Sequence, residues 1–122
     1  MATINPTQDR NTANGAIIVT WPAMGNADSG SPFMLAFAAN LTLQQSGTFG
    51  GATIVLEGSN DGVNWFTLTQ QGGNNVAMSF TSIGVHSPVE NPIYVRPRTS
   101  GGTGTAIDAI LAVHAMYQKV AY

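Results

Sequence analysis

The chain has 122 residues, six acidic and four basic side chains, no cysteine and a net charge of −2. This length indicates one domain, and the lack of cysteine excludes disulfides and thiolate metal sites. Charged residues make up only 8% of the chain, against about 25% in typical soluble proteins. The small number of basic residues argues against a nucleic-acid partner, and weak self-repulsion favours packing against other protein.

The N-terminal segment Met1–Gly15 is polar and lacks the basic start and apolar stretch of a signal peptide. It predicts an extended N-terminal arm, which either frays or lies on a neighbouring subunit, followed by one domain of residues 16–122. Within the arm, Ile4, Pro6 and Arg10 are candidate partner contacts. No run reaches the roughly 18 apolar residues of a membrane span, so we expect no membrane partner and a chain that stays in the cytoplasm where it is made.

The short apolar run Ala16–Trp21 predicts a strand, which the next residue, a proline, should end. The segment Pro22–Pro32 is rich in Pro, Gly and Asx residues and predicts a loop. Its Asn26 and Asp28 could bind a cation, but Asx residues in such a segment are typical of a plain turn. Trp21 is a further candidate partner contact.

The segment Phe33–Leu43 alternates strictly between two faces and predicts a single strand with one face in the core. Its other face is small and weakly polar, which makes it a candidate contact surface for a partner. The predicted core-facing residues are Phe33, Leu35, Phe37, Ala39, Leu41 and Leu43.

The next stretch predicts a β-hairpin. Thr53–Gly58 alternates as a half-buried strand does, Ser59–Gly62 is a polar turn that contains Asp-Gly, and Trp65–Leu68 returns. One of Trp65 and Phe66 should face inward. We expect Trp65 to cap the core; the alternative is an exposed Trp65 that stacks on a sugar or fills a partner's pocket.

Two further strands are predicted at Val76–Phe80 and Asn91–Arg98. Proline cannot donate to a ladder, so the second strand should lie at a sheet edge or break at Pro97. The residues on its non-core face, together with Trp65, complete the candidate partner contacts: Tyr94, Arg96 and Arg98.

The final element is Thr105–Tyr117, which follows a Gly-rich turn. Its long alternation favours a strand, and its alanines and a stripe of apolar residues leave a helix as the rival. Seven or eight short strands joined by Gly, Asn and Pro turns predict an all-β, single-domain antiparallel β-sandwich, jelly-roll-like, with a barrel as the alternative.

No pattern of catalytic residues stands out. His86 and His114 lack a metal-ligand spacing, no Gly-x-Ser-x-Gly run is present, and the carboxylates show no paired arrangement beyond the hairpin turn. We therefore expect a protein that is not an enzyme, with no catalytic, cofactor-binding or metal-binding residue and no small-molecule substrate.

The segment from Gly47 to Ala115 resembles the discoidin-like, galactose-binding type of β-sandwich. The shared features are Leu56–Trp65 (LEGSNDGVNW), then Tyr94–Pro97 (YVRP), then the closing apolar strand. The resemblance implies this fold. The cysteines and the long N-terminal half common in that family are missing here.

The whole chain also resembles small bacteriophage structural proteins, through Gly47–Thr53, Gly58–Trp65, Tyr94–Pro97 and Gly101–Thr105. This resemblance implies a virion part, with a capsid decoration or cement protein as the best match. Such a protein would bind the major capsid protein of its own phage on the outer surface of the head, commonly as a homotrimer. The alternative is a carbohydrate-binding module of a phage tail or head fibre that recognises the host surface.

Overall fold

The computed structural model describes residues 2–10, 15–35 and 39–115. This part of the chain forms two β-sheets and no helix. Sheet A contains β1 (Thr3–Ile4), β4 (Ser29–Gly30), β5 (Phe33–Met34), β7 (Thr53–Ser59), β8 (Phe66–Thr67), β9 (Ser79–Phe80) and β11 (Tyr94–Ser100). Sheet B contains β2 (Thr7–Arg10), β3 (Ile17–Met24), β6 (Ala39–Thr48), β10 (Gly84–His86) and β12 (Ala106–Ala115).

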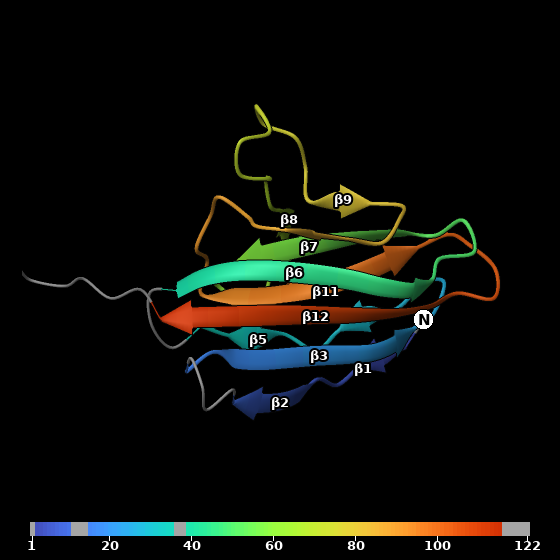
Figure 1. Ribbon diagram of the computed structural model, residues 1–122, viewed down its shortest axis with the longest axis horizontal. Helices are drawn as coiled ribbons and strands as arrows, with labels where there is room; N and C mark the ends of the chain where they lie inside the picture. The colour runs from blue at the N-terminus through green and yellow to red at the C-terminus, as the bar shows by residue number, and fades with distance from the viewer. Residues whose placement is uncertain (1, 11–14, 36–38, 116–122) are drawn as a thin grey trace, which may run out of the picture.

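The order of the strands is that of a jelly roll. Sheet B runs β10-β6-β12-β3-β2, and sheet A runs β1-β4-β11-β7-β8, with β5 beside β11 and β9 beside β7. The chain therefore passes from one sheet to the other at most connections, and Figure 1 shows β6, β12 and β3 lying in front of β11 and β7. This arrangement confirms the predicted all-β sandwich with jelly-roll-like topology.

The core lies between the two sheets and is built from alternating residues of both. In β12, Ile107, Leu111 and Val113 are buried, as Ile54 and Leu56 are in β7. Alternate residues of β12 lie outside the core, which is the period of a strand. The predicted strand is confirmed over Ala106–Ala115 and the helical alternative is wrong there; the predicted end at Tyr117 lies outside the described residues.

The prediction of one continuous strand over Phe33–Leu43 is wrong. Its beginning forms β5 in sheet A, and its end forms the start of β6 in sheet B. Alternation continues across the gap, because Phe33 and Leu35 pack against the core and Leu41 and Leu43 are buried in it. The pattern identified the inward side chains but not the change of sheet, since both sheets present their inner face to the same core. Phe37 lies outside the described residues.

The prediction that the proline after Trp21 ends its strand is wrong. Strand β3 continues to Met24, because it contains a β-bulge at this point. Trp21 pairs with Ala109 and Met24 pairs with Ile107, so two residues of β3 oppose one residue of β12. Ala23, in this bulge, has a φ of 50°. The bulge removes the proline from the regular ladder, where its missing N–H would leave a gap.

The prediction that the strand with Pro97 lies at a sheet edge or breaks at this proline is wrong. Strand β11 continues through Pro97 and lies inside sheet A. It runs between β7 and the short strands β4 and β5, and Pro97 pairs with Leu56 in the middle of it. The Cδ of Pro97 lies only 2.6 Å from where a Cβ of Gly30 would stand. The proline nitrogen therefore faces β4, which pairs with β11 only at Arg98 and Ser29 and does not need an N–H from Pro97.

The separate N-terminal arm predicted for residues 1–15 is wrong for the described residues 3–10. Thr3–Ile4 pairs with β4 in sheet A, and Thr7–Arg10 pairs with β3 in sheet B. The backbone N–H of Ala2 also donates to Asp28 Oδ1 at 3.0 Å. Polar composition concealed these strands, because an edge strand leaves its side chains exposed while its backbone pairs with the sheet. Residues 11–14 lie outside the described part.

Candidate functional site

A cluster of charged and aromatic side chains covers the outer face of sheet A. Glu57 on β7 accepts a hydrogen bond from Arg96 Nε at 3.0 Å and another from Arg98 Nε at 3.1 Å, both on β11. The carboxylate is almost fully buried between the two arginines, whose side chains are partly exposed. The strand register produces this contact, since Arg96 pairs directly with Glu57 and Arg98 with the next residue but one along the same face.

Trp65 lies on this cluster and not in the core. The guanidinium carbon of Arg96 is 4.2 Å from the centroid of the indole ring, and Trp65 is half-buried. The expectation that Trp65 caps the core is therefore wrong. Tyr94 is on the same strand and face as Arg96, against the turn at Gly62. The structure thus brings together four of the predicted contact residues: Trp65, Tyr94, Arg96 and Arg98.

The other four candidates are dispersed. Ile4 packs against the edge of the core, Pro6 lines a mostly apolar cavity of about 340 Å³, and Arg10 is exposed at the end of β2. Trp21 has no exposed surface, and its Nε1 donates to the carbonyl of Ser31 at 2.9 Å. The prediction of Trp21 as a partner contact is therefore wrong, because its whole ring fills the core.

The turn after β7 is fixed by one carboxylate. Asp61 accepts hydrogen bonds from the backbone N–H groups of Asn64 and Val63, each at 2.8 Å, and from the side chains of Asn64 and Ser59. These bonds, that from the Asn64 N–H first, hold the pKa of Asp61 well below its usual range. The predicted bonding of Asp61 to the backbone of its own turn is therefore confirmed, but the connection from Ser59 to Phe66 is longer than the predicted turn Ser59–Gly62.

This turn forms one wall of a groove of about 580 Å³ beside β8. Phe66 lines the groove and is 70% exposed. The other side carries Glu90, which accepts hydrogen bonds from the backbone N–H of Thr69 at 2.9 Å and from its hydroxyl at 2.7 Å. Burial opposes ionisation of Glu90, but these two bonds and one from its own backbone N–H together outweigh burial and lower the pKa of Glu90. Phe66 was missed as a site residue, because strand alternation predicts that only one of Trp65 and Phe66 faces outward, whereas neither ring lies in the core.

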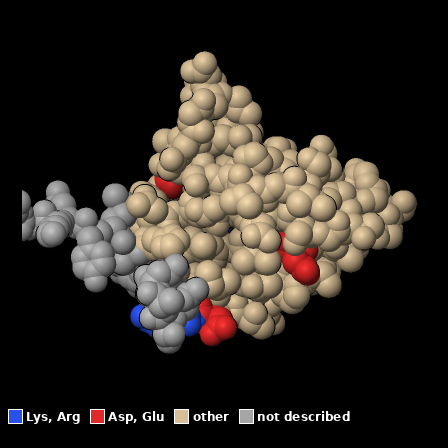
Figure 2. Space-filling model, in the orientation of Figure 1, with Lys and Arg blue, Asp and Glu red and all other residues tan. Residues whose placement is uncertain are grey.

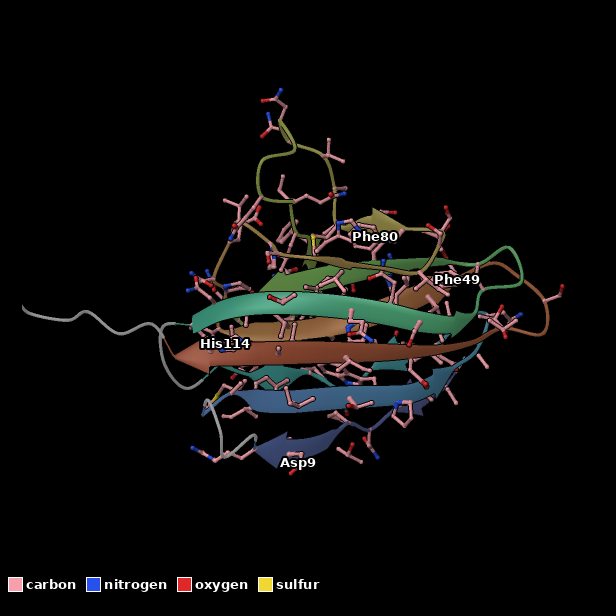
Figure 3. All side chains as sticks on the ribbon, in the orientation of Figure 1. Asp9, Phe49, Phe80 and His114 are labelled. Carbon is pink, nitrogen blue, oxygen red and sulfur yellow. The ribbon has the colours of Figure 1, made fainter. Side chains whose placement is uncertain are left out.

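The outer face of sheet B has a different character. Across its middle, Ile110 pairs with Thr20 on one side and Gln44 on the other, and Ala112 pairs with Ile18 and Thr42. Figure 2 shows few charged residues on this side of the molecule. One acidic residue, Asp108, lies on the middle strand β12, where its Oδ1 accepts a hydrogen bond from the backbone N–H of Ala23 at 2.9 Å. Two residues at the margin of the face are labelled in Figure 3: Asp9 on the edge strand β2 and His114 near the end of β12.

The two histidines lie on different strands of sheet B, His86 on β10 and His114 on β12, with β6 between them. The ring of His86 stacks on Phe80, with centroids 4.1 Å apart (Figure 3 labels Phe80). Among the described residues, no three His, Asp or Glu side chains gather in a way that could hold a metal ion. The same residues contain no helix that could span a membrane.

The strand order thus defines an all-β jelly-roll sandwich. No family model matches the chain, and no curated protein matches it. It is similar in fold to a solved structure described as the crystal structure of the SPBc2 prophage-derived protein YomS, with a TM-score of 0.61 and 14% identity. The match covers 80% of this chain and 94% of the solved chain. At this identity the similarity bears on the fold.

Proposed function

We propose that this protein is a structural component of a phage virion, a decoration or cement protein that binds the outer surface of the head and stabilises the shell. Its partner would be the major capsid protein of the same phage, and its binding form a homotrimer. The similarity of fold to a prophage-derived protein supports a phage origin. A protein that binds the assembled shell and not its free subunits stabilises the shell by mass action.

The observation that carries the proposal is the low charge of the outer face of sheet B, whose centre carries no charged side chain. Its centre is formed by Ile18, Ile110 and Ala112, surrounded by Thr20, Thr42 and Gln44. The centre of such a face can be buried against another protein without removing a charged group from water, and removing a charge from water is the most costly part of burying a polar surface. Depletion of charge at the centre is also what distinguishes protein interfaces from other surface.

Co-sedimentation with expanded, undecorated heads tests the proposal. We expect saturable binding at a fixed ratio to coat subunits and a higher melting temperature of the shell. The copy number per shell, with sedimentation velocity of the free protein, gives the oligomeric state. If the protein stays in the supernatant at every concentration, the decoration role is wrong.

Two matched variants locate the contact. Ile110→Lys places a charge at the centre of the sheet B face and should abolish binding to heads. Val63→Lys places the same charge on a side chain that is 76% exposed in the turn after β7, and should leave binding unchanged. Both should keep the melting temperature of the free protein within a few degrees. If Ile110→Lys still binds heads, the sheet B face is not the contact.

A further inference from the structure

The groove beside β8 has the size of a ligand site. Its volume of about 580 Å³ falls within the roughly 300–1,000 Å³ of typical small-molecule pockets. It is formed on the sheet A side, by the end of β7, by β8, and by the segment 90–92. It is therefore separate from the sheet B face through which binding to the shell is proposed.

Among the described residues, the most exposed aromatic side chain borders this groove. Phe66 on β8 leaves 70% of its surface open, although it pairs in register with the buried Gly58. The face of an aromatic ring is electron-rich and attracts the polarised C–H groups of a ligand lying over it. Sugar rings present such C–H groups on one face and hydroxyls around the rim.

Both carboxylates that line the groove are already used by the protein. Asp61 holds the turn through the N–H groups of Val63 and Asn64, and Glu90 holds Thr69. They set the positions of the groove walls before any ligand arrives. A wall that is already fixed costs less ordering entropy on binding.

The polar groups that are left for a ligand are uncharged. Asn60 uses its Oδ1 to accept from the N–H of Ile93 at 3.1 Å, and its amide N–H groups have no partner among the described residues. The same holds for the side chains of Asn91 and Thr67, which also line the groove. Amides and hydroxyls can each donate and accept, as the hydroxyls of a sugar can.

An anionic ligand does not fit this set of residues. No lysine or arginine is among the described residues that line the groove, and the two carboxylates would repel a negative charge. We propose that the groove binds a neutral saccharide, with one sugar ring stacked on Phe66 and its hydroxyls bonded to the amides of Asn60 and Asn91. A protein attached to a shell through sheet B would then display a saccharide-binding site from its other sheet.

An array of immobilised neutral and acidic oligosaccharides tests this proposal on the full chain. We expect binding to neutral oligosaccharides, followed in solution by perturbation of the Asn60 and Asn91 side-chain amide signals in NMR titration with the neutral oligosaccharide that binds best. Phe66→Ala should weaken binding by about tenfold or more. Since Phe66 is mostly exposed, the variant should remain folded. Val63→Ala, an equally exposed turn residue outside the groove lining, is the matched control.

Four outcomes would overturn the proposal. These are no binding to any neutral oligosaccharide on the array, binding of acidic oligosaccharides alone, unchanged affinity in Phe66→Ala, or capture of unglycosylated peptides in place of sugars. The result is separate from the proposed shell binding. Phe66→Ala should co-sediment with heads as the natural protein does, and Ile110→Lys should keep its affinity for the saccharide.

Discussion

The guanidinium carbon of Arg96 lies over the indole ring of Trp65, 4.2 Å from the ring centroid, and the Nε of the same group donates a hydrogen bond to Glu57 at 3.0 Å. This contact places Trp65 on the outer surface of sheet A. A double-mutant cycle with Trp65→Ala and Arg96→Ala should give a coupling of about 0.5–1 kcal/mol, the size of a cation–π contact at an exposed site. Urea denaturation provides the measurement. Independent effects of the two substitutions would contradict the stacking.

Glu57 accepts hydrogen bonds from both Arg96 and Arg98 of β11, so its substitution should remove an ion pair from each arginine. Glu57→Gln should lower the free energy of unfolding by about 1–2 kcal/mol, because the carboxylate is nearly buried while the arginines are partly exposed and screened by water. Asp9→Asn, an exposed carboxylate on the edge strand β2, is the control and should change stability by less than about 0.5 kcal/mol. Equal effects of the two substitutions would show that the Glu57 pair contributes nothing specific.

Gly30 is required by the close approach of β4 to β11. A Cβ at this position would stand 2.6 Å from Pro97 Cδ and 2.8 Å from Trp21 Cδ1. Gly30→Ala should therefore destabilise the protein by about 1–3 kcal/mol, the usual effect of overpacking a core. The neighbouring Ser29→Ala should have little effect. Thermal unfolding of both variants would decide, and a Gly30→Ala variant as stable as the natural chain would be inconsistent with this packing.

Gln45 on β6 is a polar residue among the buried side chains. Its Nε2 donates to the carbonyl of Ser82 at 3.2 Å, while its Oε1 has no hydrogen-bond partner among the described residues. Gln45→Met keeps the volume and removes the unpaired oxygen, so it should raise the free energy of unfolding by about 1 kcal/mol. Gln44→Met, on the exposed face of the same strand, should not. A large loss of stability in Gln45→Met would contradict this expectation and would show that the hydrogen bond from the Gln45 amide to Ser82 stabilises the fold.

The stability that Asp61 contributes should be lost in acid. Its folded pKa is lowered by the hydrogen bonds from Asn64 and Val63, so its contribution is complete above the unfolded pKa of about 4. The contribution is lost as the pH falls through the folded value. The difference in stability between the natural chain and Asp61→Asn should thus shrink from pH 6 towards pH 2. A difference that is constant over this range would show that the carboxylate charge has no role in the turn.

The sequence by itself determined the features that depend on neighbouring residues. Alternation identified β12 as a strand and Thr53–Ser59 as β7 to within one residue, since the inward and outward sides of a strand repeat every second residue. The bonding of Asp61 to its own turn could also be predicted, because its partners are only two and three residues further along the chain. The many short strands joined by Gly, Asn and Pro turns were enough to predict an all-β sandwich.

The tertiary structure alone decided which strands pair and which face each side chain meets. The change of sheet between Phe33–Met34 and Ala39–Thr48, the place of β11 in the sheet interior, and the pairing of the N-terminal strands all depend on residues distant in the sequence. So does the groove beside Phe66, because the turn at Asp61 and the segment at Glu90 meet only in the folded chain. A local pattern records the period of a strand, but its partners are chosen by packing and backbone pairing across the whole sandwich.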